Sequence, residues 1–313
     1  MLSYIIRRLL IFIPTIFVLS LLVFVAIEAG PGDPASYMLD PDMPTDHLNR
    51  LREGLGLDRP LLARYATWIR EFLRGNWGHS ILDGASVKGL LLTRIPRTLY
   101  LMGLALTLAI TFGVVFGVIS ALHQYSPMDN TLTFIGLFGI STPAFFTGLL
   151  GILFFSLRWD ILPIGGMGTR PGLGEALRHM ILPASVLAFR SGSEFMRYTR
   201  GAMLDALNKD YIALAQSKGL PVWRVTYVHG LRTALIPVVT IVVLRLPILV
   251  GGSVIVEQVF SWPGIGTMLI TAARGQDFPV VMAVALLLGV ALLFSSLLAD
   301  ILLAIIDPRV RLG

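Results

Sequence analysis

The sequence predicts an all-α integral membrane protein with six transmembrane helices. Of its 313 residues, 55% are apolar and only 14% are charged, whereas soluble domains carry about 25% charged residues. The mean hydropathy is +0.77. Apolar runs long enough to cross a hydrocarbon core of about 30 Å are bounded by charged residues or by Gly and Pro clusters. They cover residues 8–28, 98–122, 131–157, 179–199, 234–256 and 278–306.

The first run begins after Arg7 and Arg8 and carries no charge from Leu9 to Ile27. A signal peptide has an apolar core of about 7–15 residues and a small-residue cleavage site. This run is longer, and no A-x-A site follows it. We therefore expect residues 1–30 to form an uncleaved first transmembrane helix.

Residues 31–97 are predicted to form a region outside the membrane. The stretch LLARYATWIREFLRGNWG places Trp68, Phe72 and Trp77 near helical spacing, with arginines between the apolar positions. This pattern favours an amphipathic helix that lies on the membrane surface or packs on the outer ends of the spans. A direct role in ligand binding is the alternative.

Residues 98–313 are expected to form a five-helix core. Gly113 and Gly117 form a G-x-x-x-G pair, which lets helices approach closely in lipid. Prolines inside a span are tolerated where neighbouring groups satisfy the freed carbonyls. Four prolines are expected to be of this kind: Pro143, Pro183, Pro237 and Pro247.

Charged residues inside the spans are the first candidate functional residues. Arg190 and Glu194 are four residues apart, so they share a helix face and can pair, and Arg245 lies in the fifth run. Charges in lipid are costly and usually face the bundle interior or a watery path. They indicate either a polar translocation path or a salt bridge that fixes helix packing, and Arg245 favours the path.

The second candidate is a basic segment at residues 200–233, here called the coupling loop. Its Lys and Arg residues place it on the inside of the membrane, together with both chain ends. Two short helices are expected there, broken at Gly219-Leu220-Pro221. A helix with one anchoring face fits a groove on a partner protein; an ordinary surface helix is the alternative.

Several function classes are excluded by missing residues. The chain has no cysteine, no phosphate-binding G-x-x-x-x-G-K-[ST] loop, no H-E-x-x-H and no G-x-S-x-G motif. Its histidines do not cluster with carboxylates. We expect no catalytic residue, cofactor or metal in this chain, so a function that requires ATP would need another chain to bind and hydrolyse it. The net charge is +6, but the basic residues flank the apolar runs, so the charge does not indicate nucleic-acid binding.

A family resemblance runs nearly from end to end. Its segments, in order, are PGDPA, LGLDRPLLARYATWIREFLRGNWGHSI, RIPRTLYL, STPAFFTGLLGILFFSLRWDILPIGG, DYIALAQSKGL, WPGIGTMLITAARGQDFPVV and DPRVRLG. The chain resembles the permease subunits of ATP-binding-cassette importers in the dipeptide, oligopeptide and nickel branch. One such segment would carry little weight, but all of them in order are specific.

The resemblance implies a type I importer permease fold in a bacterial or archaeal cytoplasmic membrane. It also implies a second related permease subunit, two ATPase subunits that bind ATP and Mg, and an extracytoplasmic solute-binding protein. Short peptides are the expected solute, with a nickel chelate, glutathione or an oligosaccharide as alternatives. A self-contained channel or ion-coupled carrier would need a clustered acidic site or an internal repeat, and the sequence has neither.

The resemblance also assigns the coupling loop to the contact with the ATPase. The family's loop motif begins Glu-Ala-Ala, whereas this chain has Ala213-Leu214-Ala215, and Asp210 one turn earlier is a substitute for the missing carboxylate. The residues expected to couple are Asp210, Tyr211, Leu214, Ala215, Lys218, Gly219, Leu220 and Arg224.

Overall fold

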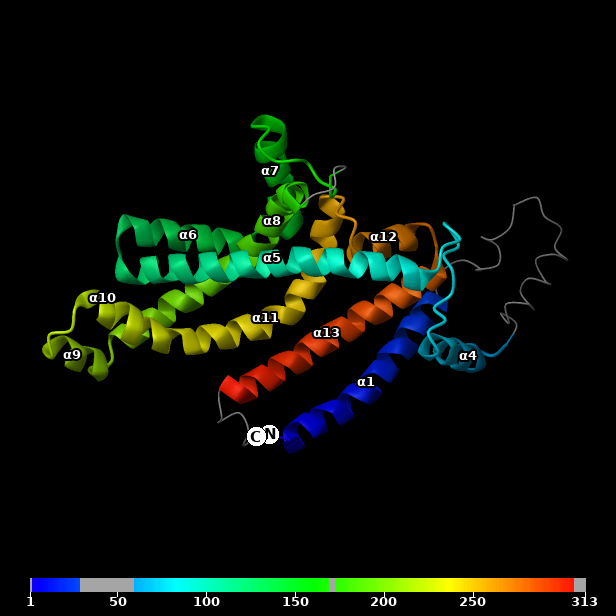
Figure 1. Ribbon diagram of the computed structural model, residues 1–313, viewed down its shortest axis with the longest axis horizontal. Coiled ribbons are helices and arrows are strands. Elements are labelled where there is room, and N and C mark those ends of the chain that lie inside the picture. The colour runs from blue at the N-terminus through cyan, green and yellow to red at the C-terminus, as the bar shows by residue number, and fades with distance from the viewer. Residues whose placement is uncertain (1, 29–58, 169–172, 307–313) are drawn as a thin grey trace. The chain divides into compact units, whose positions relative to one another are not determined.

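The computed structural model describes residues 2–28, 59–168 and 173–306, and every regular element within them is helical (Figure 1). The longer elements are α1 (Leu2–Glu28), α4 (Leu61–Leu73), α5 (Val87–Leu122), α6 (Pro127–Ser141), α7 (Ala144–Gly151), α8 (Leu173–Leu207), α9 (Asp210–Ser217), α11 (Leu231–Val259), α12 (Ile265–Arg274) and α13 (Phe278–Ile306). The short helix α10 (Val222–Arg224) and two π-helical segments, Ile152–Arg158 and Val225–Gly230, complete the set. The all-α prediction is confirmed.

Four helical stretches are long and apolar enough to cross a membrane: Leu10–Ile27, Val87–Leu122, Val222–Pro247 and Phe278–Leu302. Helix α6 and the helical stretch Ala144–Arg158 pass the same test together, which gives up to five spans among the described residues. The run expected at 179–199 lies inside α8, which is 35 residues long and therefore about 52 Å. Helix α8 is less apolar than the stretches above because it contains charged residues such as Arg190 and Glu194.

The apolar run expected at residues 131–157 is not one unbroken helix, although its two parts together still qualify as one span. The chain bends by 113° between α6 and α7. The cause is Pro143, because a residue before proline avoids the helical region. Thr142 is accordingly extended, with φ −88° and ψ 130°. The other three prolines stay inside α8 and α11, as predicted.

The described residues form two compact units, and the first contains Thr98–Pro263. Helix α8 has close neighbours here. A Cβ on Gly113 of α5 would lie 2.5 Å from the Cβ of Phe195, and one on Gly117 would lie 2.5 Å from the Cβ of Thr199. The predicted close helix approach at the G-x-x-x-G pair is confirmed.

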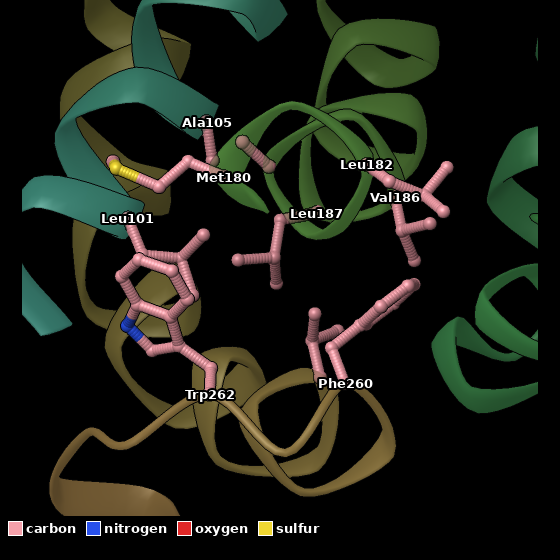
Figure 2. Packing of buried hydrophobic residues seen from close by; sticks show 10 residues of the cluster. Leu101, Ala105, Met180, Leu182, Val186, Leu187, Phe260 and Trp262 are labelled. Atoms are coloured by element: carbon pink, nitrogen blue, oxygen red, sulfur yellow. The ribbon is translucent and has the colours of Figure 1, made fainter. Parts of the chain in front are cut away.

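Nearer the N-terminus of α8, the core of this unit includes residues that directly follow α11. Phe260 and Trp262 are almost completely buried and pack with residues of α8 and α5 (Figure 2). Leu101, Leu182 and Leu187 are among their partners. Large aromatic side chains dominate such cores because each buries about 150–250 Å².

Among the described residues, the second unit contains 6–28, 59–97 and Gly264–Ala291. The start of α5 packs on α12 and α13 through a buried apolar cluster that includes Val87, Met268 and Val284. The carboxylate of Asp277 is buried just before α13, where it accepts hydrogen bonds from the Ser80 hydroxyl and from the Ile81 backbone N–H. In the same unit, the predicted amphipathic helix is α4.

Candidate functional site

The coupling loop has the predicted shape of two helices separated by a glycine and a proline. Helix α9 ends at Ser217, and Gly219 follows in the left-handed region with φ +74°. Pro221 then precedes α10, which continues through the π-helical segment into α11. The loop between regular spans is shorter than expected, because α8 extends to Leu207 and the next helical stretch begins at Val222.

Six of the eight expected coupling residues are exposed and two face inwards. The exposed set is Asp210, Tyr211, Leu214, Lys218, Gly219 and Arg224. Ala215 is buried, and Leu220 is half-buried. Both pack with Ile212 and Val225 in a small apolar cluster that joins α9 to the π-helical segment. These two residues therefore hold the loop together.

Three further apolar residues of the loop are open to a partner and were missed from the sequence. Val222, Trp223 and Tyr227 are 77%, 56% and 51% exposed. The Arg224 guanidinium carbon lies 5.3 Å from the centre of the Trp223 ring, within the range of a cation–π contact. Trp, Tyr and Arg are the residue types enriched at binding hot spots. All three lie within the coupling loop as bounded from the sequence, but the expected coupling residues were chosen around α9 and included only Arg224 from this stretch.

The loop is attached to the helices behind it by close packing. A Cβ on Gly230 would lie 3.1 Å from a side-chain carbon of Leu207, so the end of α8 touches the π-helical segment. Next to this contact, Met203 of α8, Ala234 of α11 and Val118 of α5 share a buried cluster. The coupling loop is thus in packed contact with three long helices, α5, α8 and α11.

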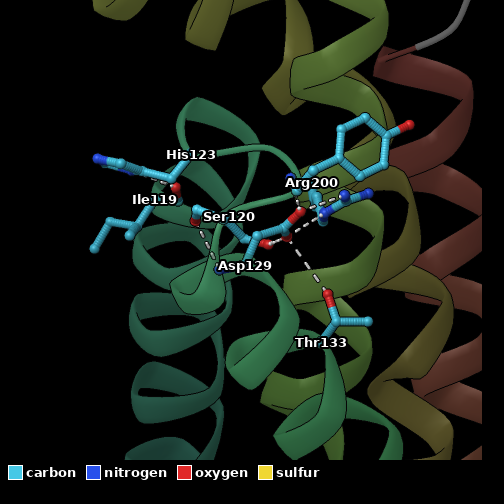
Figure 3. Close-up of polar contacts among 8 residues, drawn as sticks. Ile119, Ser120, His123, Asp129, Thr133 and Arg200 are labelled. Atoms are coloured by element: carbon cyan, nitrogen blue, oxygen red, sulfur yellow. Dashed lines mark hydrogen bonds and ion pairs between the residues drawn. The ribbon is translucent and has the colours of Figure 1, made fainter.

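A polar clamp, Asp129 with Arg200, joins α6 to α8 near the same place (Figure 3). Asp129 is buried, and its two carboxylate oxygens accept hydrogen bonds from Nε and Nη2 of Arg200, each 2.7 Å long. The Ser120 hydroxyl and the Tyr125 backbone N–H also donate to it. A carboxylate held by both donors of one guanidinium is among the stronger hydrogen-bonded pairs in proteins.

Asp129 was not identified from the sequence, although a signal was present. Ser126, Pro127 and Asp129 have the pattern of a helix start, in which Ser or Thr precedes an acidic residue by three. The Ser126 hydroxyl accepts the Asp129 backbone N–H at 3.2 Å. The pattern locates the residue at the first turn of α6, but it does not reveal the partner 71 residues away.

The intramembrane charges pair differently from the expectation. Glu194 of α8 forms its ion pair with Arg245 of α11, not with Arg190. The expected Arg190–Glu194 pair is therefore wrong, because Arg190 is exposed on α8 while Glu194 meets the neighbouring helix. Among the described residues, no group of His, Cys, Asp and Glu could hold a metal ion.

Two family descriptions match the chain and together cover almost all of it. Residues 113–312 match the binding-protein-dependent transport system inner membrane component family. Residues 1–102 match the N-terminal region of membrane components of the same transport systems.

Curated relatives match over nearly their whole length. The oligopeptide transport system permease protein AppB of Bacillus subtilis (strain 168) is 41% identical over 315 residues, which cover 99% of this chain and 100% of the relative. The di/tripeptide transport system permease protein DppB of Pseudomonas aeruginosa (strain UCBPP-PA14) is 39% identical, with 99% of each chain covered. The glutathione transport system permease protein GsiC of Escherichia coli (strain K12) is 36% identical, again with 99% of each covered.

Proposed function

The chain belongs to the family of binding-protein-dependent transport system inner membrane components, and we propose that it forms half of a translocation path driven through the coupling loop. It is the permease subunit of an ATP-binding-cassette importer for peptides. It is not an enzyme, because ATP hydrolysis in such systems belongs to a separate subunit. The protein is a multi-pass component of the inner membrane.

The observation that best supports this mechanism is that the coupling loop exposes apolar side chains on one side and packs against the helices behind it on the other. Tyr211 and Leu214 on α9, with Trp223 after the break, are open to a partner, while the buried side of the loop is fixed to α8 and α11. An ATPase groove that received this face would move the long helices as a rigid body. Closure of two ATPase subunits, each with bound ATP and Mg, is the proposed source of force.

The proposed topology has six spans, with both chain ends in the cytoplasm of a bacterium or archaeon. The span added to the five described above is α8. Its Glu194 carboxylate is paired with Arg245, which lowers the free-energy cost of placing that charge in the membrane. A second, related permease subunit would complete the path, and an extracytoplasmic binding protein would deliver the solute. Arg190, Glu194 and Arg245 are proposed to line the path.

Short peptides are the proposed solute, and glutathione is the second candidate. The oligopeptide and di/tripeptide permeases support the first, and the glutathione permease supports the second. Glutathione is itself a tripeptide, so the two candidates share a chemical class. Uptake by the assembled importer, with labelled dipeptide and labelled glutathione in competition, separates them.

The coupling role is tested by placing a charge on the apolar face. We expect Leu214→Asp to abolish ATP-driven peptide uptake by the reconstituted importer and to weaken retention of the ATPase, because an unpaired carboxylate in an apolar groove is costly to bury. The matched control is Gln216→Asp, which adds the same charge to an exposed position elsewhere on α9.

The control variant should retain uptake within about twofold, since surface substitutions change free energies by roughly 0.5 kcal/mol or less. Normal uptake by Leu214→Asp would contradict the coupling role. Peptide transport by liposomes that contain this chain alone, with no ATPase, would contradict the whole proposal.

A further inference from the structure

The length of α1 and the charged residues at its two ends indicate how deep it lies in the membrane. Its uncharged run, Leu9–Ile27, is about 28 Å long, close to the thickness of the hydrocarbon core. Arg8 precedes the run and Glu28 follows it. With the proposed topology, Ile27 marks the outer boundary of the hydrocarbon.

Helix α4 packs on α1 below this outer boundary. The Tyr65 ring lies 5.8 Å from the ring of Phe17 and 5.5 Å from that of Phe24, measured between centroids. Its hydroxyl is hydrogen-bonded to the Ser20 hydroxyl at 2.6 Å. Ser20 is about 10 Å below Ile27 along the helix. Helix α4 is therefore held beside the outer hydrocarbon layer and not in the water above it.

The face of α4 next to this packed side is apolar and mostly exposed, with Ile69 half-buried. Leu62, Ala66, Ile69 and Leu73 recur at i, i+4, i+7 and i+11 and form one stripe, here called the α4 stripe. Leu62 is 70% exposed and Leu73 is 79% exposed. In water such a stripe would be unfavourable, whereas at this depth hydrocarbon chains can cover it.

The third face of α4 is polar and basic. Arg70 and Arg74 are one turn apart beside the α4 stripe, and both are exposed. Arg74 also pairs with Glu71 at 3.1 Å in the same helix. Long arginine side chains can leave apolar surroundings and place the guanidinium among lipid headgroups. The guanidinium matches the geometry of a phosphate group.

We propose that α4 is an interfacial helix that binds phospholipid of the outer leaflet. The α4 stripe contacts acyl chains, and Arg70 and Arg74 bind the phosphates of anionic headgroups. The helix thereby anchors the outer end of α1 at a fixed depth. Acyl chains are the occupant proposed for the stripe because the contacts of Tyr65 hold α4 alongside the apolar part of α1, and a protein that covers the stripe is an outcome of the test below.

The absence of cysteine from the sequence permits a direct test of depth. Single variants Leu62→Cys and Leu73→Cys would carry an environment-sensitive fluorophore in the assembled importer in lipid nanodiscs. Thr67→Cys is the matched control, since Thr67 is exposed on the basic face of the same helix. Quenching is compared between spin-labelled phosphatidylcholine and aqueous iodide.

We expect the spin-labelled lipid to quench positions 62 and 73 and iodide to quench position 67. Iodide quenching at all three positions would overturn the proposal, because the stripe would then face water. Protection of positions 62 and 73 from both quenchers would also overturn it, since a protein would then cover the stripe. Failure of peptide uptake in the unlabelled importer would instead count against the proposed function.

The headgroup contact is tested by mass spectrometry of the importer purified from nanodiscs that contain phosphatidylglycerol and phosphatidylcholine. The double variant Arg70→Gln/Arg74→Gln should lose roughly fivefold to thirtyfold of the preference for phosphatidylglycerol, as expected for two cations near an anionic surface. Arg274→Gln, at an exposed arginine on α12, should keep it. An unchanged preference in the double variant would overturn the phosphate contact.

Discussion

At the residue scale, the charges in α8 illustrate what spacing can and cannot reveal. A separation of four residues places Arg190 and Glu194 on the same side of a helix, and that much followed from the sequence. The structure pairs Glu194 with Arg245, 51 residues later. Sequence spacing describes neighbours within one helix only. Which neighbouring helix supplies an ion-pair partner depends on packing, which no local pattern contains.

The Glu194–Arg245 pair leads to a prediction about assembly and transport. Arg245→Ala should destabilise the importer by about 1–3 kcal/mol, because it leaves a partly buried carboxylate without a partner. Exchange of the two charges in Glu194→Arg/Arg245→Glu should restore thermal stability in detergent. If the pair lines the path, the exchanged variant should still transport peptide at a changed rate. Full recovery of uptake would show a purely structural role.

At the element scale, the sequence predicted every long helix but not every boundary. Residues 278–306 agree with α13, because Phe278 follows a turn and no charged residue occurs from Phe278 to Ala299. Helix α8 was placed at 179–199 and extends well beyond both ends, since its polar flanks are stabilised by neighbours and not by lipid. The bend at Pro143 was missed because a proline inside an apolar run can be tolerated or can break the helix, depending on tertiary contacts.

The turn between α9 and α10 permits a test of loop conformation without a steric clash. Gly219 has φ +74°, and a Cβ there would have open space within 4 Å. Gly219→Val should therefore cost about 1–2 kcal/mol through backbone strain alone and should lower peptide uptake per ATP hydrolysed. Gly219→Asn is the matched control, because asparagine adopts this conformation more readily. Equal coupling in both variants would contradict a need for this turn.

At the scale of the whole molecule, coupling requires that movement of the loop reaches helices far from it in sequence. The described contacts give such a route within one compact unit. The loop is held on α8 and α11 by apolar packing, and the Asp129–Arg200 clamp adds α6. A packed assembly of this kind moves as a body because its interior deforms little. The clamp is the part of the route that can be removed by a single substitution.

We expect Asp129→Ala to lower both stability and coupling. Loss of one partner from a buried ion pair costs about 3–5 kcal/mol, and Arg200 would remain with its side chain only 25% exposed. Arg200→Lys keeps the charge but loses the two-point contact, so its effect should be intermediate. Asp205→Asn is the matched control, since Asp205 is exposed on α8. The measurements are thermal unfolding of the assembled importer and the number of ATP molecules hydrolysed per peptide imported. If Asp129→Ala lowers stability while this ratio stays at the wild-type value, α6 need not move with α8 during transport.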